Sequence, residues 1–512
     1  MTKSLSDSGM SESLSAEHEQ LGKLATEIIA RYARTLEDVR VCSEVTPAEL
    51  EKMFDEPLPL EGVGAPELFR RFEREIVPHA MNIPSPRYYG LFNPTPLPVA
   101  VWADALTSAI NQNAAAWRNS PSGSVIESRV MRWLCEIVGY GAGSFGTLTS
   151  GGSEANLLAL KCARDRAADF VRDRGMRAAS LPTGRTANDA SRASATAGNM
   201  IVYASEQCHY SFVKSVDILG LGRENLRKVA TDERFHIRTD VLRREIERDL
   251  EAGNLPACIA GAAGATSTGI IDPLDELAAL ANEYKLWFHV DGAYGATLAM
   301  SEKYKHRLRG IERADSVTID PHKWMFVPFA AGAVLVREGG RVLRDAFDIT
   351  PEYLSEERGG EDVPFDFFRY GQLGTRRFNA LKIWFALKTL GTRGYAEIIE
   401  RQIELTEYFA ARVAALAEFE CVGEVETAVC CLRFVPAGMR GAEGAEIDAL
   451  QRELQQCIER SGAAWFSTTV LDGRRALRVN VNSFLTERRH IDDLLESLRR
   501  ESREVLKARE TL

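Results

Sequence analysis

Runs of β-branched and apolar residues alternate with stretches of helical periodicity from about residue 100 to residue 345. Strands that alternate with helices predict parallel βαβ units. We therefore expect residues 100–390 to form one large α/β domain built on a doubly wound sheet. The predicted strands are GTLTS, NMIVYAS, ACIAGAAGAT, LWFHVDGAYGA, SVTID and AGAVLVRE.

The segments on either side of this region have different patterns. Residues 1–16 are polar and rich in serine, which predicts a disordered tail. Apolar positions at helical spacing begin at Leu21, so residues 17–99 are predicted to form an N-terminal helical segment. Residues 391–512 follow a predicted helix, RRFNALKIWFALKTL, and combine long helical stretches with strands such as CCLRFVP and ALRVNVN. They predict a smaller C-terminal α+β domain.

Charge and cysteine usage narrow the classes of partner. The 63 basic and 73 acidic residues give a net charge of -10, which argues against nucleic acid and anionic membranes as partners. No stretch reaches the roughly 18 apolar residues of a membrane helix, and the N-terminus lacks the apolar core of a secretory signal. The 9 cysteines form no CxxC pair and have no metal-ligand spacing to the 8 histidines. We expect a cytoplasmic protein that binds small molecules and no metal.

Residues that directly follow strands are the candidates for chemistry, because ligands of open α/β sheets bind beyond the carboxyl ends of the strands. The turn GTLTSGGSEAN offers backbone amides at a helix N-terminus, with Gly152 and Ser153 as candidates for binding a phosphate. Glycine and serine also occur in such turns for geometry alone. The turn lacks the Gly-Lys-Ser/Thr ending of a Walker loop, and GLGREN, the nearest match to a dinucleotide fingerprint, lacks its third glycine.

Three further strand ends carry polar side chains. Asp291 ends LWFHVD and needs a cation or a donor if it is buried, although it could also cap a helix. His209 follows NMIVYAS; its flat ring could stack on an aromatic ligand, or it could be a structural histidine. Thr266 and Thr268 in GATSTG could be simple turn hydroxyls.

A lysine completes the set. Lys323 follows the strand SVTID, and a lysine in a confined site can act as a nucleophilic amine. A phosphate turn, a strand-end carboxylate, a stackable ring and a lysine together meet the needs of pyridoxal 5'-phosphate (PLP), which forms a Schiff base with lysine. Lys323 could instead cap a helix or pair with an acidic residue on the surface.

The segments TSGGSEANLLAL, HVDGAYGA and SVTIDPHKWM, in this order and spacing, resemble the PLP-dependent group II amino-acid decarboxylases. The resemblance extends from about residue 20 to near residue 500. It implies the aspartate-aminotransferase-like fold (fold type I) with a mainly parallel seven-stranded sheet. It also implies a homodimer with active sites at the interface, in which residues 17–99 pack on the partner.

The resemblance implies a role for each motif residue. Lys323 would bind the cofactor, Asp291 its pyridine nitrogen and His209 its ring face, while the loop ITPEYLSEERGG would supply Tyr353 as the proton donor to Cα. One departure is Asp320, which stands where the family often has asparagine near the phosphate. The remaining implied cofactor ligands are Gly152, Ser153, Thr266 and His322.

The resemblance implies decarboxylation of an L-amino acid to its amine and CO2. The aromatic residues of SPRYYGLFNPTP and AAAWRNSPSG favour an aromatic substrate, while Arg478 in ALRVNVNSF could bind a carboxylate and keeps acidic substrates open. A diamino-acid decarboxylase, a decarboxylating aldehyde synthase and a cofactor-free relative with a binding or regulatory role also stay open. The candidate substrate residues are Tyr88, Phe92, Thr95, Trp117 and Arg478.

Overall fold

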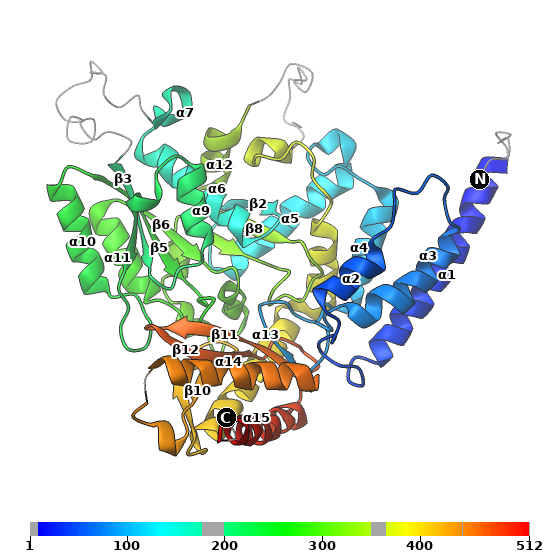
Figure 1. Ribbon diagram of the computed structural model, residues 1–512. Helices are drawn as coiled ribbons and strands as arrows, with labels where there is room; N and C mark the ends of the chain where they lie inside the picture. The colour runs from blue at the N-terminus through cyan, green and yellow to red at the C-terminus, as the bar shows by residue number, and fades with distance from the viewer. Residues whose placement is uncertain (1–8, 177–198, 350–364, 443, 511–512) are drawn as a thin grey trace.

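The computed structural model describes residues 9–176, 199–349, 365–442 and 444–510, and its largest element is a seven-stranded sheet (Figure 1). Strand β8 runs antiparallel to both of its neighbours, and the other six strands share one direction. The mainly parallel seven-stranded sheet is therefore confirmed. Across the sheet the strands are β2 (Phe145–Thr149), β8 (Gly332–Val336), β7 (Ser316–Ile319), β6 (Trp287–Asp291), β5 (Leu255–Ala262), β3 (Met200–Ser205) and β4 (Leu226–Val229).

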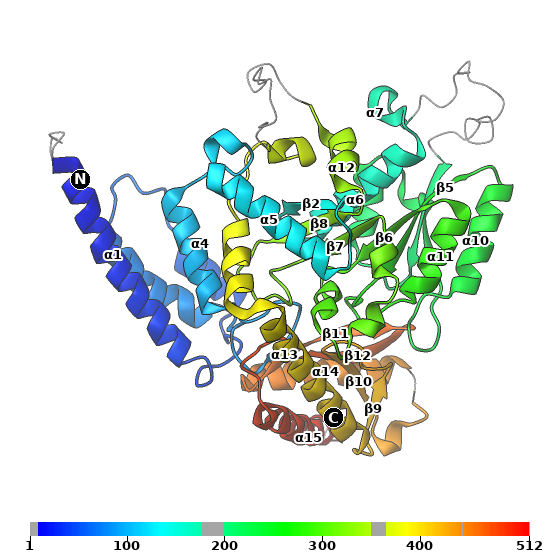
Figure 2. The same cartoon turned by 180° about the vertical axis from the view of Figure 1, so that it is seen from behind.

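Helices cover both faces of this sheet, which explains why strands β2, β3, β7 and β8 are buried along their whole length. Helices α6 and α9 lie on one face, and α5, α10 and α11 lie on the other (Figures 1 and 2). Since the parallel strands end at one edge, the loops after β3, β5, β6 and β7 meet the turn between β2 and α6 there. The helices are α5 (Pro121–Ile137), α6 (Gly152–Ala167), α7 (Val171–Arg174), α9 (Ser211–Ile218), α10 (Thr239–Glu251), α11 (Leu274–Tyr284) and α12 (Gly339–Phe347).

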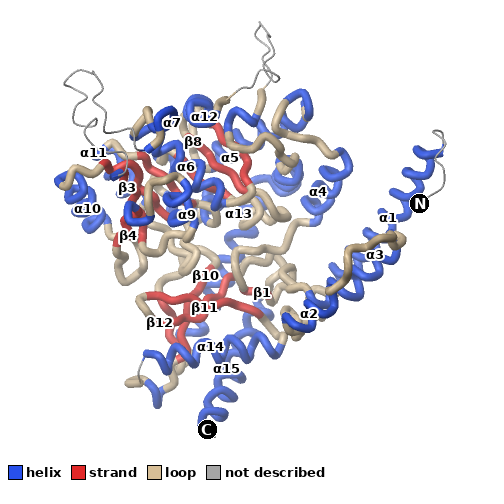
Figure 3. The backbone as a smooth tube through the Cα atoms, turned by 45° about the horizontal axis from the view of Figure 1, so that its top comes forward, coloured by secondary structure: helices blue, strands red, loops and turns tan. Residues whose placement is uncertain are grey.

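A second sheet has five strands and lies apart from the first (Figure 3). Helix α13 (Ala380–Ala414) connects the two regions and contains a kink at Gly391, where φ is 61°. Helices α14 (Gly444–Ser461) and α15 (Arg488–Glu510) pack against each other, and α14 covers strands β11 and β12. In order, the strands are β1 (Tyr88–Tyr89), β11 (Trp465–Leu471), β12 (Arg474–Asn480), β10 (Val429–Phe434) and β9 (Phe419–Val422).

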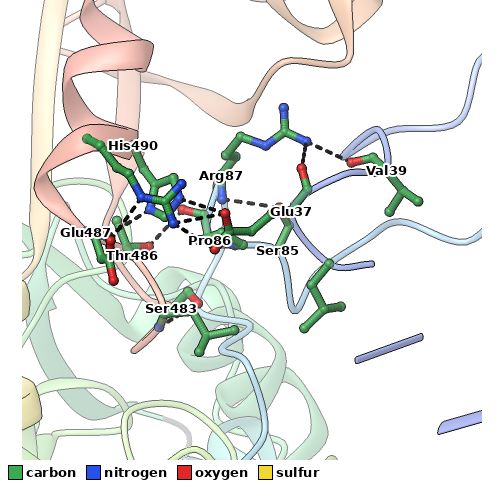
Figure 4. Close-up of polar contacts among 12 residues, drawn as sticks. Glu37, Val39, Ser85, Pro86, Arg87, Ser483, Thr486, Glu487 and His490 are labelled. Carbon is green, nitrogen blue, oxygen red and sulfur yellow. Dashed lines mark hydrogen bonds and ion pairs between the residues drawn. The ribbon is translucent and has the colours of Figure 1, made fainter. Parts of the chain in front are cut away.

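Strand β1 belongs to the N-terminal part of the chain but pairs in parallel with β11 of the C-terminal part. Side-chain contacts reinforce this junction (Figure 4). Arg87 donates to the carbonyl oxygens of Glu37 and Val39, and the Thr486 hydroxyl donates to the carbonyl oxygen of Pro86 at 2.8 Å. The segment around residues 85–89 is thereby held between the N-terminal helices and the second sheet.

The N-terminal helices project from the body of the molecule (Figures 1 and 3). Helix α1 begins at Gly9, inside the region for which the sequence predicts a tail, and contacts α3. Helix α2 begins with a reciprocal capping box between Thr46 and Glu49. The projecting helices are α1 (Gly9–Arg34), α2 (Pro47–Phe54) and α3 (Ala65–Arg71), whereas α4 (Pro98–Ile110) packs against α13.

In the described part of the chain, none of the helices combines the length and the apolar character needed to cross a membrane. This part of the chain also contains no group of three or more histidine, cysteine, aspartate or glutamate side chains arranged to hold a metal ion.

Candidate active site

A cavity of about 390 Å³ lies at the carboxyl edge of the large sheet. Loops that follow four strands of this sheet, together with the start of α6, form its wall, as expected for a doubly wound sheet. The fold therefore brings most of the candidate residues together at one place. The predicted residues that line the cavity are Phe92, Gly152, Ser153, His209, Thr266, Asp291, His322 and Lys323.

Lys323 lies in the turn after β7, opposite a buried carboxylate. Its Nζ atom is 3.0 Å from Oδ2 of Asp320, whose side chain is only 1% exposed. The turn itself is closed by a hydrogen bond from the Lys323 amide to the Asp320 carbonyl oxygen, at 2.8 Å. Oδ1 of Asp320 has no hydrogen-bond partner among the described residues. The lysine amine therefore enters the cavity beside a carboxylate that is only half satisfied.

Asp291, the last residue of β6, reaches the same cavity. Its Oδ2 atom accepts a hydrogen bond from Nδ2 of Asn156 at 2.9 Å, and its Oδ1 atom accepts one from the Ala293 amide at 3.3 Å. These two N–H donors hold the Asp291 carboxylate in one orientation at the cavity wall.

His209 lies in the loop after β3, before helix α9. Its Nδ1 atom is 2.8 Å from the Ser211 hydroxyl and accepts a hydrogen bond from the Ser211 amide. Burial lowers the pKa of the imidazole below its usual value, although the nearby Asp291 carboxylate acts in the opposite direction. A neutral, flat ring therefore lines the cavity at pH 7.

The start of α6 can receive an anion. The amides of Gly152 and Ser153 are in the first turn, where a helix has no internal acceptor for its N–H groups. A Cβ atom added at Gly152 would lie 2.9 Å from Oδ2 of Asp320, and one added at Gly151 would lie 3.3 Å from Cε1 of His322. A larger residue at position 152 would therefore force Asp320 to shift, and one at position 151 would press on His322.

Of the five predicted substrate residues Phe92 alone lines the cavity, and Tyr88, Thr95 and Trp117 make other contacts. The Tyr88 ring stacks on Trp465 at 5.3 Å, where it stabilises the pairing of β1 with β11. The buried Thr95 hydroxyl is 2.6 Å from the Ser483 hydroxyl. Trp117 begins a short 3₁₀ turn, in which its amide donates to Asp366. Within the single chain these side chains make packing and anchoring contacts, and their substrate role stays a prediction.

Arg478 in β12 adjoins the cavity through Phe92. Its guanidinium lies 4.8 Å from the centroid of the Phe92 ring. Nε donates to the carbonyl oxygen of Thr266 at 2.7 Å and Nη1 to that of Gly90 at 3.1 Å. Nη2 is buried and has no hydrogen-bond partner in the part of the chain that is described. This guanidinium therefore keeps unused N–H donors.

The cavity also contains features that the sequence did not reveal. Phe92 stacks on Tyr294 at 3.8 Å, and Tyr294 stacks on Trp324 at 4.4 Å, so a column of three aromatic rings ends at the cavity. Asn156 also lines it. A signal for Asn156 existed in the sequence, since it is a polar residue on the apolar face of a predicted helix. Tyr353, the predicted proton donor, lies outside the described residues.

The residues present fit PLP. The cofactor needs an amine, an anion at its pyridine nitrogen, a phosphate site and a flat contact. Lys323, Asp291, the α6 amides and His209 line one cavity and supply these four features. The carboxylates of Asp320 and of Glu154, which also lines the cavity, are features that a phosphate would not favour.

Comparison with known proteins agrees with this geometry. The model of the pyridoxal-dependent decarboxylase conserved domain matches residues 47–435. An aromatic-L-amino-acid decarboxylase of Bacillus atrophaeus is 31% identical over 92% of this chain and 93% of its own length. An acidic amino acid decarboxylase of Xenopus tropicalis is 30% identical over 79% of this chain and 75% of its own. The crystal structure of Catharanthus roseus tryptophan decarboxylase in complex with L-tryptophan superposes with a TM-score of 0.84, at 26% identity, over 98% of this chain and 99% of that chain.

The fold and the site thus define a PLP-dependent enzyme of fold type I. More specifically, the chain belongs to the pyridoxal-dependent decarboxylases and is a PLP-dependent amino-acid decarboxylase. The predicted family, fold class and cofactor are confirmed.

Proposed function

We propose that this enzyme converts an aromatic L-amino acid to the corresponding amine and CO2. The observation that carries the proposal is the convergence of Lys323, Asp291 and His209 on a cavity that also contains the end of an aromatic column. An aromatic wall favours a flat apolar side chain. The Bacillus atrophaeus and Catharanthus roseus relatives bear the names of aromatic and tryptophan decarboxylases, which supports this choice.

Each site residue has a distinct task in this proposal. Lys323 binds the cofactor through its amine, and the amides of Gly152 and Ser153 bind the phosphate. His209 stacks on the ring face, and Thr266 and His322 complete the wall of the cofactor site. When bound, PLP accepts the electron pair that remains on Cα after CO2 leaves.

Asp291 determines how well that chemistry works. A carboxylate beside the pyridine nitrogen keeps a proton on that nitrogen, because the opposite charges attract. The N–H donors of Asn156 and Ala293 hold the carboxylate in place. Tyr353 then delivers a proton to Cα, which directs the reaction to the amine.

An acidic amino acid is a second candidate substrate. The observation that favours it is the unused Nη2 donor of Arg478, since a guanidinium binds carboxylates well. The similarity to an acidic amino acid decarboxylase supports the same substrate class.

The test is an assay of CO2 and amine from a panel of amino acids with PLP-loaded enzyme. We expect a higher kcat/KM for the aromatic substrates tryptophan, tyrosine, phenylalanine and 3,4-dihydroxyphenylalanine than for glutamate, aspartate and 2,4-diaminobutyrate. The ratio should be at least about tenfold, because one good apolar contact in a pocket gives discrimination of this size. Aldehyde and ammonia as main products would instead identify an aldehyde synthase. Borohydride reduction of loaded enzyme, followed by peptide mapping, should label Lys323. Protein that binds no PLP would indicate a cofactor-free relative.

We further propose that the enzyme works as a homodimer with active sites at the interface. Leu58 and Leu60 of the projecting N-terminal segment are 87% and 97% exposed in the single chain. Tyr210 and Phe329, two aromatic residues of the cavity wall, are 59% and 52% exposed. Apolar surface of this kind indicates a protein contact. Light scattering should give twice the chain mass, and Leu58→Asp combined with Leu60→Asp should weaken the dimer; a monomeric wild type would refute the proposal.

In the same proposal residues 17–99 pack on the dimer partner, residues 100–390 form the cofactor-binding domain and residues 391–512 form the small domain. A cytoplasmic location is part of the same proposal, because all nine cysteines are free thiols, as is usual in a reducing compartment. Fractionation of cells that produce the protein tests the location. Recovery in the membrane fraction or outside the cell would contradict it.

A further inference from the structure

The Asn156 side chain lies beneath the cavity and makes four hydrogen bonds. Asn156 is in the second turn of α6 and is 1% exposed. Its Nδ2 atom donates to Oδ2 of Asp291 at 2.9 Å and to Oγ of Ser211 at 3.0 Å. Its Oδ1 atom accepts from Thr318 at 2.7 Å and is 3.0 Å from Nε2 of His289. The amide thus uses its full hydrogen-bonding capacity.

The orientation of this amide determines where the proton on His289 lies. The Asp291 carboxylate only accepts, so Nδ2 of Asn156 must face it and Oδ1 must face His289. Nε2 of His289 therefore carries the proton. Burial lowers the pKa of His289 to about 4, so the ring is neutral and its Nδ1 atom accepts from the Ser316 hydroxyl at 2.8 Å. Trp287 donates to that hydroxyl and leaves its proton free to point at His289.

The same reasoning determines the tautomer of His209. The Ser211 oxygen already accepts an N–H of Asn156, so the Ser211 hydroxyl is free to donate to Nδ1 of His209. The Ser211 amide donates to the same nitrogen. Nδ1 of His209 is therefore an acceptor, and the single proton of the neutral ring is on Nε2.

We infer that Asn156 is a positioning residue that fixes both the Asp291 carboxylate and the Nε2–H tautomer of His209 through one amide. One N–H group of this amide donates to Asp291 and the other donates to Ser211, whose hydroxyl contacts His209. The oxygen of the amide is held from below by Thr318 and His289. The inference rests on the roles proposed for Asp291 and His209 toward PLP. It assigns to Asn156 the coupling between them.

The test compares Asn156→Asp with wild type, since the two side chains have the same shape. Aspartate at this position still accepts from His289 and Thr318, but it replaces both N–H donors by an anion beside Asp291. The Ser211 hydroxyl then donates to the new carboxylate and no longer to Nδ1 of His209. That nitrogen keeps only the Ser211 amide, at 3.3 Å, as a donor, so the Nε2–H tautomer loses its stronger support. Two carboxylates in one site also disfavour a second charge. The matched control is Thr318→Val, which removes a contact to Oδ1 and leaves both donors of Asn156 in place.

Two measurements are made. In cofactor-free protein, 15N NMR of labelled histidine, with His209 assigned by its loss in His209→Gln, reports the tautomer. We expect Nδ1 of His209 to be the unprotonated nitrogen in wild type and Thr318→Val, and to be protonated in a measurable fraction of the Asn156→Asp molecules. In titrations with PLP we expect the Kd to rise at least about tenfold in Asn156→Asp, because a hydrogen bond to a charged group is lost, and to stay within about threefold in Thr318→Val.

An unchanged tautomer together with an unchanged Kd in Asn156→Asp would overturn the inference. If Asn156→Asp does not fold, Asn156→Ala is measured in the same way, and wild-type values for it would have the same meaning. Failure of the proposed function would give a different result. Wild-type protein would then bind no PLP, but the tautomer of His209 would still differ between wild type and Asn156→Asp.

Discussion

The amine of Lys323 and the carboxylate of Asp320 form an ion pair at 3.0 Å inside the candidate active site. The family often has asparagine at the second of these positions, so the pair gives this chain an extra negative charge next to the reactive lysine. The carboxylate is buried and has one oxygen without a partner in the described part of the chain. It therefore acts on Lys323 more strongly than an exposed residue would.

This pair predicts the effect of Asp320→Asn on cofactor capture. An amine held in an ion pair with a buried carboxylate is less available to attack an aldehyde than an unpaired amine is. The variant should therefore react with PLP faster than wild type at pH 7. Stopped-flow absorbance of cofactor-free protein mixed with PLP measures the rate. Glu154→Gln is the control, because Glu154 lines the same cavity but its carboxylate accepts hydrogen bonds from Ser150. Equal rates in Asp320→Asn and wild type would contradict the prediction.

Arg478→Met should separate the two candidate substrate classes. Methionine keeps an unbranched stem and removes the unused donor. If Arg478 contacts only the acidic side chain of a substrate, kcat/KM for acidic amino acids should fall about 30-fold, which corresponds to the loss of one hydrogen bond to a charged group. Activity on aromatic amino acids should change less than about fivefold. The measurement is kcat/KM for both classes.

The control for this variant is Arg433→Met, which removes a buried arginine of the same sheet that contacts Glu420 and Asp448. Equal losses for both substrate classes in Arg478→Met, with little loss in Arg433→Met, would show that the guanidinium binds a group common to all substrates.

The ion pair between His236 and Glu426 should make stability depend on pH. Nε2 of His236 is 2.7 Å from Glu426, Asp232 lies 3.6 Å from Nδ1, and the hydrogen bond to Glu426 is the main reason why the pKa of His236 is raised. Because the pKa of His236 is higher in the folded than in the unfolded protein, its protonation stabilises the fold. The contribution is complete at pH values below the pKa of histidine in the unfolded chain, about 6.5, and is lost as the pH rises through the pKa of His236 in the folded protein. Burial raises the pKa of the neighbouring Asp272 to about 6. Ionisation of Asp272 therefore also lowers the free energy of unfolding as the pH rises, but at lower pH than the deprotonation of His236.

We therefore expect the melting temperature of wild type to fall more than that of His236→Gln between pH 6 and pH 9. The difference should correspond to about 1 kcal/mol, the size of one partly buried charged hydrogen bond. Calorimetry of both proteins at several pH values measures it. Parallel curves would show that His236 contributes nothing.

Tyr353→Phe should change the products. Without the phenol, protonation of Cα slows, and dioxygen can oxidise the intermediate. Amine formation should fall at least about tenfold, the lower range for general acid catalysis, while aldehyde, ammonia and hydrogen peroxide appear in equal amounts. Product analysis in aerated and in oxygen-free buffer measures this change. Undiminished amine without aldehyde would exclude the assigned role.

Residues that follow strands were the easiest to predict from the sequence. The six predicted strands correspond to β2, β3, β5, β6, β7 and β8. Because their ends meet at one edge, Asp291, His209 and Lys323 had to be close together. Strand β4 was not predicted, since its four residues include two basic ones and only its first and last residues are buried.

Residues whose position depends on distant segments were harder to predict. Tyr88 belongs to an aromatic segment of the expected composition, but its ring packs on Trp465, which only the pairing of β1 with β11 reveals. Asn156 could be assigned only when its neighbours from β6, β7 and α9 were known. Local sequence predicts which side of an element is buried, whereas the partner on the other side comes from tertiary structure.

The pairing of β1 with β11 also limits when this enzyme can mature during its synthesis. Tyr88 and Tyr89 leave the ribosome early, but Trp465 and Phe466, the residues they pair with, are among the last to be made. Gly90 and Phe92 directly follow β1 and contact Arg478 of β12. These contacts also form only after the C-terminal strands have been synthesised. A nascent chain that stops before β11 can complete the large sheet, yet it cannot close this wall of the pocket, so interrupted translation should yield folded but inactive fragments.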